Sequence, residues 1–106
     1  MTQYLLNEDM LWDLTTRAIR AVHGGPYGPD RTEPLLGFPR IVLAPCIDKA
    51  LETRSLKGLT KAEGQAIVKG VAAAVELFDE VDCEAIIGYP KMQVKAALGV
   101  LSQRWR

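Results

Sequence analysis

The chain has 106 residues, of which 48% are hydrophobic and 25% are charged, and its 13 basic side chains balance its 13 acidic ones. A length near 100 residues is typical of one domain with its own core, and this hydrophobic content excludes a disordered chain. Proteins that bind nucleic acid or anionic membranes through long-range electrostatic attraction usually carry an excess of basic residues, and this chain has none, since its net charge is zero. We therefore expect residues 1–106 to form a single domain.

The first predicted element is a helix that begins after Asn7, a favourable N-cap residue, and ends at Gly24–Gly25. Apolar residues recur at helical spacing between these limits. The apolar positions of its main face are Met10, Leu11, Leu14, Ala18, Ala21 and Val22. A second apolar ridge, Leu5, Trp12 and Ile19, repeats every seven residues on nearly the opposite side. A helix with two apolar sides either lies centrally in the fold or contacts a partner.

The next segment, residues 24–39, contains four of the six prolines and four of the nine glycines. This composition predicts an irregular loop, and its length indicates either a functional role or poor order. A helix from about residue 39 to residue 54, kinked at Pro45, is favoured for the segment that follows. The alternative is a short buried strand over 40–44 and a helix that begins at Pro45.

The clearest predicted helix covers residues 61–81. Thr60 and Glu63 form the T-x-x-E pattern of a capping box, and the apolar positions then step by three and four residues. Those positions are Ile67, Val71, Ala74, Phe78 and Val81. Residues 84–88 allow a brief strand or a helical turn, and Pro90 fits the start of a last helix.

These elements predict a small all-α domain of four helices with an irregular loop at 24–39. The apolar face expected for the last helix consists of Val94, Ala97, Leu98, Leu101 and Trp105. The alternative is an α+β domain in which short strands form near 40–44 and 84–88.

No group of residues in the sequence has the pattern of a catalytic or metal-binding site. His23 is the only histidine, and neither Cys46 nor Cys83 lies in a CxxC pair. The cysteines are therefore expected to be reduced core residues. The carboxylates between Glu76 and Glu84 do not match a calcium-binding loop. We expect no enzyme activity, no cofactor and no metal.

The start of the chain has no signal-peptide pattern, because it lacks a basic region and reaches a carboxylate at residue 8. The longest uncharged stretches are far shorter than the ~18 apolar residues of a membrane span. The expected location is the cytoplasm, without a membrane partner.

The segment after residue 82 carries a motif-like pattern centred on Gly88. Tyr89 follows this glycine directly, and Val94 lies six positions after it. The pattern resembles the turn and recognition helix of helix-turn-helix DNA-binding proteins, in which a glycine forms the turn and a valine at this distance locks the second helix onto the first. The resemblance implies that residues 82–105 form the motif.

On this resemblance, Lys91, Gln93 and Lys95 would face the major groove of DNA. The implied function is a DNA-binding transcriptional regulator, which is the alternative hypothesis for this chain. The balanced charge makes nucleic acid the less expected partner.

The favoured hypothesis is a small regulatory protein without enzyme activity that acts by binding another protein. Adaptors and inhibitors, including those that phages encode, have this size and charge. Self-association as a homodimer would use the same surface. The expected contact residues are Leu5, Trp12 and Ile19 on the second ridge and Tyr27 in the loop. Trp12 is the expected anchor, because tryptophan is enriched at interface hot spots.

Overall fold

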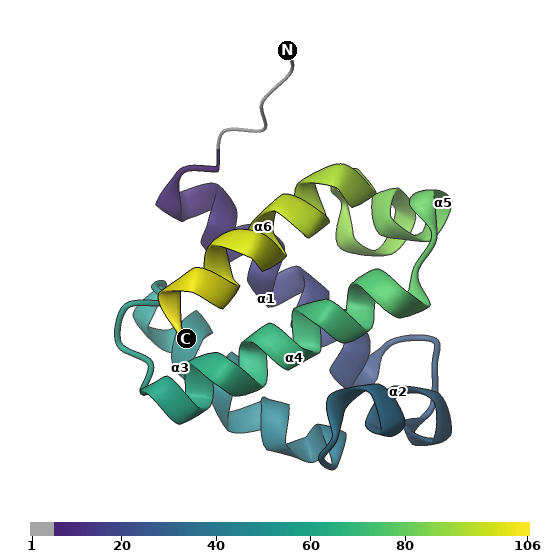
Figure 1. Cartoon of the computed structure of the whole chain (residues 1–106), viewed down its shortest axis with the longest axis horizontal. Helices are drawn as coiled ribbons and strands as arrows, with labels where there is room; N and C mark the ends of the chain where they lie inside the picture. Colours follow the sequence, from purple (N-terminus) through teal and green to yellow (C-terminus); the bar gives the residue numbers. More distant parts are fainter. Residues whose placement is uncertain (1–5) are drawn as a thin grey trace.

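The computed structural model describes residues 6–106, and the regular structure of that range is entirely helical (Figure 1). The helices are α1 (Glu8–Gly24), α2 (Pro29–Leu36), α3 (Leu43–Thr53), α4 (Lys61–Leu77), α5 (Glu80–Asp82) and α6 (Lys91–Arg104). A 3-10 turn, η1 (Arg40–Val42), precedes α3, and a π-helical turn, η2 (Cys83–Ile87), continues α5. The prediction of an all-α fold is confirmed, although residues 6–106 form six helices rather than four.

Both segments considered as strands, 40–44 and 84–88, are helical, so the α+β alternative is wrong. Residues 40–44 lead from η1 directly into α3. Pro45 therefore lies in the first turn of α3, where its missing N–H costs no intrahelical hydrogen bond. Residues 84–87 belong to η2, and Gly88 ends this turn in the left-handed conformation, with φ of 88°. Its N–H donates to the carbonyl oxygen of Cys83 at 2.9 Å.

The segment 24–39, predicted as an irregular loop, contains helix α2. Pro29 occupies its first position, where the fixed φ of proline suits a helix. Gly37 ends it with φ of 80° and donates its N–H to the carbonyl oxygen of Glu33 at 2.9 Å. Composition did not predict α2, because the helix contains Pro34 and proline inside a helix is normally unfavourable.

Helix α4 is central and packs against α1, α2, α3 and α6 (Figure 1). The predicted capping box is present at its start. Thr60 Oγ1 accepts the N–H of Glu63 at 3.2 Å, and Glu63 Oε1 accepts the N–H of Thr60 at 2.8 Å. The helix ends at Leu77 rather than at the predicted residue 81, and Phe78 adopts extended backbone. The Phe78 side chain still lies in the core, with 1% of its surface exposed.

Small residues on α4 let the neighbouring helices approach closely. A Cβ atom added at Gly70 would lie 2.9 Å from Ile19 Cγ2 of α1 and 3.4 Å from Leu43 Cδ2 of α3. A Cβ atom added at Gly64 would overlap the indole ring of Trp105, which follows α6. Helices α1, α3 and α6 therefore converge on α4 at positions where it carries no side chain.

We predict that Gly64→Ala lowers the free energy of unfolding by about 1–3 kcal/mol, the usual cost of adding a methyl group to a packed contact. The matched control is Gly99→Ala in α6, where an added Cβ atom meets nothing within 4 Å. There the higher helix propensity of alanine should raise the free energy of unfolding by about 0.5–1 kcal/mol. Urea denaturation measures both effects. Equal effects in the two variants would contradict the contact between Gly64 and Trp105.

Candidate functional site

Two residues of the second apolar ridge, Trp12 and Ile19, lie on α1 and face the interior of the protein. Ile19 is 0% exposed and packs at Gly70 of α4. Trp12 is half-buried, and its Nε1–H donates to the carbonyl oxygen of Ala50 in α3 at 2.8 Å. Leu5 lies outside the described residues. The expectation of an exposed ridge is wrong for Ile19, because α1 is packed against both α3 and α4.

Tyr27, the fourth predicted contact residue, lies in the segment before α2 and packs against the core residue Phe78. The centroid of its ring lies 5.5 Å from that of Phe78, and the Arg31 guanidinium carbon lies 4.9 Å from the Tyr27 centroid. The Tyr27 carbonyl oxygen accepts a hydrogen bond from Arg40 Nη1 at 3.1 Å. Because Tyr27 is half-buried and holds these partners, it is engaged mainly within its own chain.

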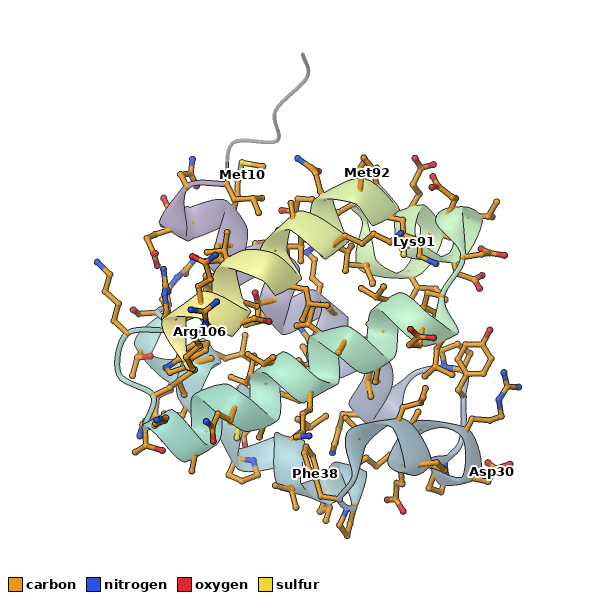
Figure 2. All side chains as sticks on the ribbon, viewed as in Figure 1. Met10, Asp30, Phe38, Lys91, Met92 and Arg106 are labelled. Atoms are coloured by element: carbon orange, nitrogen blue, oxygen red, sulfur yellow. The ribbon has the colours of Figure 1, made fainter. Side chains whose placement is uncertain are left out.

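A different apolar surface is exposed where α2 packs against η1, and we call it the apolar corner. It consists of Leu35, Ile41 and Val42, whose exposed fractions are 44%, 66% and 42%. Figure 2 shows Phe38, from the same segment, at the edge of the molecule opposite Met92. The apolar corner is therefore well separated from the α6 side of the protein.

Charge is nearly absent from the segment that forms the apolar corner. Arg40 is the only charged residue from Pro34 to Pro45, and its guanidinium already donates to the carbonyl oxygen of Tyr27. The Arg40 N–H donates to Glu33 Oε2 at 2.8 Å. The backbone N–H and the side chain of Arg40 thus attach the segment between α2 and η1 to Glu33 and Tyr27.

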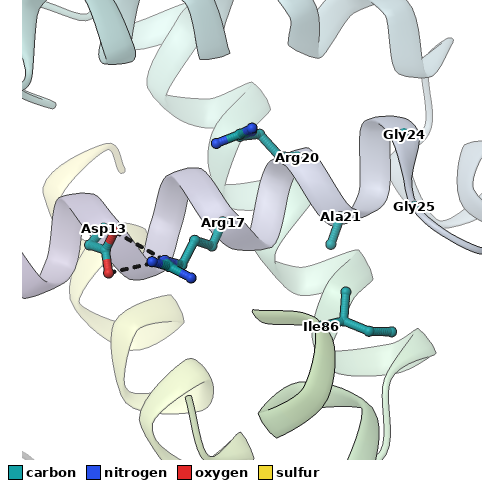
Figure 3. A pocket seen from close by; sticks show the side chains of 7 residues that line it. All are labelled: Asp13, Arg17, Arg20, Ala21, Gly24, Gly25 and Ile86. Carbon is teal, nitrogen blue, oxygen red and sulfur yellow. Dashed lines mark hydrogen bonds and ion pairs between the residues drawn. The ribbon is translucent and has the colours of Figure 1, made fainter. Parts of the chain in front are cut away.

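The exposed face of α1 carries polar side chains that border two clefts. The first, which we call the α1 cleft, has a volume of about 460 Å³ and lies between α1 and η2 (Figure 3). Its lining residues are Asp13, Arg17, Arg20, Ala21, Gly24, Gly25 and Ile86. The second has a volume of about 320 Å³ and lies between α1 and α3. Arg20 borders both clefts.

A chain of hydrogen-bonded side chains positions the polar groups of the α1 cleft. Tyr89, in the linker before α6, donates its hydroxyl proton to Asp13 Oδ2 at 2.6 Å. Both oxygens of Asp13 accept hydrogen bonds from Arg17 Nε at 3.1 Å. The Tyr89 hydroxyl and the Arg17 guanidinium together hold the pKa of Asp13 below its usual range, and the hydrogen bond to Asp13 raises the pKa of Tyr89. Asp13 is therefore ionised at neutral pH and holds Arg17 in one orientation.

The residues around Gly88 carry the pattern that resembles a helix-turn-helix motif. Helix α5 and η2 form one short helix, Gly88 makes the turn, and Val94 of α6 is fully buried. Among the predicted DNA contacts, Lys95 is exposed, whereas Lys91 and Gln93 are half-buried. Only one of the three side chains is thus presented openly to a ligand.

The two helices of this pair expose charges of opposite sign, because α6 exposes the basic Lys95 and Arg104. Glu80 and Glu84 are exposed on the first helix. Val81 and Met92 are exposed apolar residues on the same pair. Carboxylates repel the phosphate backbone that dominates the affinity of proteins for DNA. The acidic side chains of the first helix therefore disfavour the DNA-binding alternative.

The two cysteines are poorly suited to nucleophilic chemistry. Cys46 and Cys83 are free and buried, and burial raises the pKa of both thiols. A neutral thiol is a weak nucleophile. Across residues 6–106, no three histidine, cysteine, aspartate or glutamate side chains come together in a way that could hold a metal ion.

None of the helices formed by residues 6–106 reaches the length and apolar content that crossing a membrane requires.

No protein-family model, curated protein or solved structure matches this chain. Its function is therefore inferred from its own surfaces. The apolar corner and the α1 cleft are the two that carry distinct chemistry.

We predict that Ile19→Asn lowers the free energy of unfolding by more than about 3 kcal/mol, because it buries an amide in a packed apolar site. The control is Arg20→Asn at the neighbouring, exposed position, which should cost less than about 1 kcal/mol. Thermal and urea unfolding of both variants provide the measurement. A fully stable Ile19→Asn protein would mean that the second ridge of α1 is not part of the core.

We predict that Tyr89→Phe lowers the free energy of unfolding at pH 7 by about 1 kcal/mol, because Asp13 loses a hydrogen bond. The pKa of Asp13 in the folded protein is lower than the ordinary value of 3.8. The ionised carboxylate therefore contributes its full stabilisation at pH values above 3.8. This contribution is lost as the pH falls through the lowered folded-state value. In the variant, the pKa of Asp13 should rise towards 3.8, which a carboxyl NMR titration would detect.

The control for this variant is Tyr27→Phe, since the Tyr27 hydroxyl has no hydrogen-bond partner among residues 6–106. The Tyr27→Phe variant should have the same Asp13 pKa as the wild type. An Asp13 pKa that is the same in the wild type and in Tyr89→Phe would contradict the hydrogen bond.

Proposed function

We propose that this chain is a non-enzymatic protein that binds a partner protein through the apolar corner. The observation that supports the proposal is the exposure of Leu35, Ile41 and Val42 on adjoining elements, in a segment whose one charged residue is Arg40. Contiguous apolar surface that remains exposed on a folded domain marks interaction sites more often than chance. An adaptor or inhibitor is the kind of regulatory protein that such a surface serves.

The core does not need the side chains of the apolar corner. Leu36 and Leu43, which are sequence neighbours of Leu35 and Val42, are both fully buried and already attach α2 and α3 to the interior. Leu35, Ile41 and Val42 are additional to these contacts. Burying them against another protein would add apolar burial worth roughly 25 cal/mol for each Å² removed from water.

The backbone of the apolar corner is fixed before any partner arrives. Gly37 closes α2 through its bond to the carbonyl oxygen of Glu33, and Arg40 donates its N–H to the Glu33 side chain. A surface held in one conformation loses little conformational entropy on binding. Because the exposed side chains of the apolar corner, Leu35, Ile41 and Val42, are uncharged, the expected partner presents an apolar surface.

DNA binding through residues 82–105 is the second candidate function, and the left-handed turn at Gly88 before the buried Val94 favours it. The exposed Glu80 and Glu84 oppose it. A mobility-shift assay with random duplex at low salt separates the candidates. Binding that falls steeply with salt and is weakened by Lys95→Gln would support a DNA-binding protein.

We predict that Ile41→Asp abolishes partner binding without changing the melting temperature, because Ile41 is the most exposed residue of the apolar corner. The matched control is Met92→Asp, which places the same charge at an exposed apolar residue on the opposite edge. A photo-crosslinking residue at position 42 in cells of the native host would identify the partner. Sedimentation velocity would show whether the partner is a second copy of this chain.

A partner crosslinked by the wild type and the Met92→Asp variant but lost with Ile41→Asp supports the proposal. A concentration-dependent dimer that Ile41→Asp dissociates would identify the apolar corner as a homodimer interface. Identical crosslinks in all three proteins would overturn the assignment of this surface.

A further inference from the structure

We propose that the α1 cleft binds a small molecule bearing an oxyanion, either a carboxylate or a phosphate group, through the guanidinium of Arg17. This inference is independent of the apolar corner, which lies on other elements. It rests on the hydrogen bonds of Arg17, the positions of Arg20 and Ile86, and the volume of the cleft.

The guanidinium of Arg17 has one edge occupied and one edge free. Its Nε donates to both oxygens of Asp13 at 3.1 Å. Nη1 and Nη2 have no hydrogen-bond partner within residues 6–106. An arginine presents its N–H groups in a planar fork that matches two oxygens of a carboxylate or a phosphate. The Nη edge of Arg17 thus remains able to receive such a group.

Arg17 is held in place by groups from another part of the chain. Asp13 is fixed between Arg17 and the Tyr89 hydroxyl, which reaches it from the linker before α6 at 2.6 Å. Gly88 lies beside the free edge, since a Cβ atom added there would be 3.5 Å from Arg17 Nη1. A binding group that is already oriented loses less conformational entropy when the ligand arrives. This arrangement distinguishes Arg17 from an ordinary surface arginine.

The remaining lining of the α1 cleft suits a small anionic molecule with an apolar part. Arg20 lies three residues after Arg17 and makes no ion pair with any residue from 6 to 106. The two arginines and Asp13 together leave one net positive charge at the cleft. Ala21 and Ile86 supply apolar contact on its walls (Figure 3). The volume of about 460 Å³ lies within the range of small-molecule sites.

The test is a titration of the intact protein with two probes, inorganic phosphate and benzoate, with sodium chloride at matched ionic strength as the reference. NMR signals of the arginine Nε–H groups and of the backbone amides of Ala21 and Ile86 report binding. We expect saturable shifts at these positions that sodium chloride does not produce. Saturation by phosphate alone would identify a phosphate ligand, and saturation by benzoate alone a carboxylate with an apolar body.

Variants separate a built site from general attraction to positive charge. Arg17→Gln should raise the dissociation constant about tenfold or more, the effect of losing hydrogen bonds to a charged group. Arg20→Gln should raise it by a smaller factor and leaves the contacts among Asp13, Arg17 and Tyr89 intact. The matched control is Arg54→Gln, at an exposed arginine stacked on Trp12 outside the α1 cleft.

Two results would overturn the proposal. One is a linear response to both probes that equals the response to sodium chloride. The other is saturable binding whose dissociation constant is the same in the wild type, Arg17→Gln and Arg20→Gln. Because Arg20→Gln does not touch the contacts of Asp13, it keeps the test decisive even if Arg17→Gln fails to fold.

Discussion

The close approach of α1 to α4 at Gly70 determines which surfaces of this protein remain exposed. Ile19 fills the space that a side chain on Gly70 would occupy, and Leu43 of α3 packs at the same position. Once Ile19 is directed inward, the helical repeat turns Arg17 and Arg20 outward. The polar face of α1, and with it the α1 cleft, is thus a consequence of the glycine at position 70.

Local signals in the sequence predicted the features that depend on neighbouring residues. The capping box of Thr60 and Glu63 and the N-cap Asn7, which accepts the N–H of Met10 at 2.8 Å, are formed as predicted. Both depend on residues three positions apart, which a single sequence displays directly. Helix α2 was harder to predict, because Pro34 and the surrounding glycines resemble a loop in composition and its stability depends on packing against α4.

The candidate sites depend on contacts that a single sequence does not display. The i, i+4 spacing of Asp13 and Arg17 predicts their ion pair, but Tyr89 lies 76 residues after Asp13 and reaches it only through the fold. The burial of Ile19 could be resolved only by knowing that α1 packs against α3 and α4. The near absence of charge from Pro34 to Pro45 was a visible signal of the apolar corner. Its exposure, however, followed from which leucines α2 and α3 direct inward.

The left-handed turn at Gly88 also limits how this part of the chain can vary during evolution. The turn separates Ile86, which forms a wall of the α1 cleft, from Tyr89, which anchors Asp13. Residues other than glycine rarely adopt its φ of 88°. An insertion or deletion here would displace Ile86 from the α1 cleft or Tyr89 from Asp13. In this linker of three residues, 88–90, neither the length nor the identity of Gly88 can therefore change without disturbing the α1 cleft.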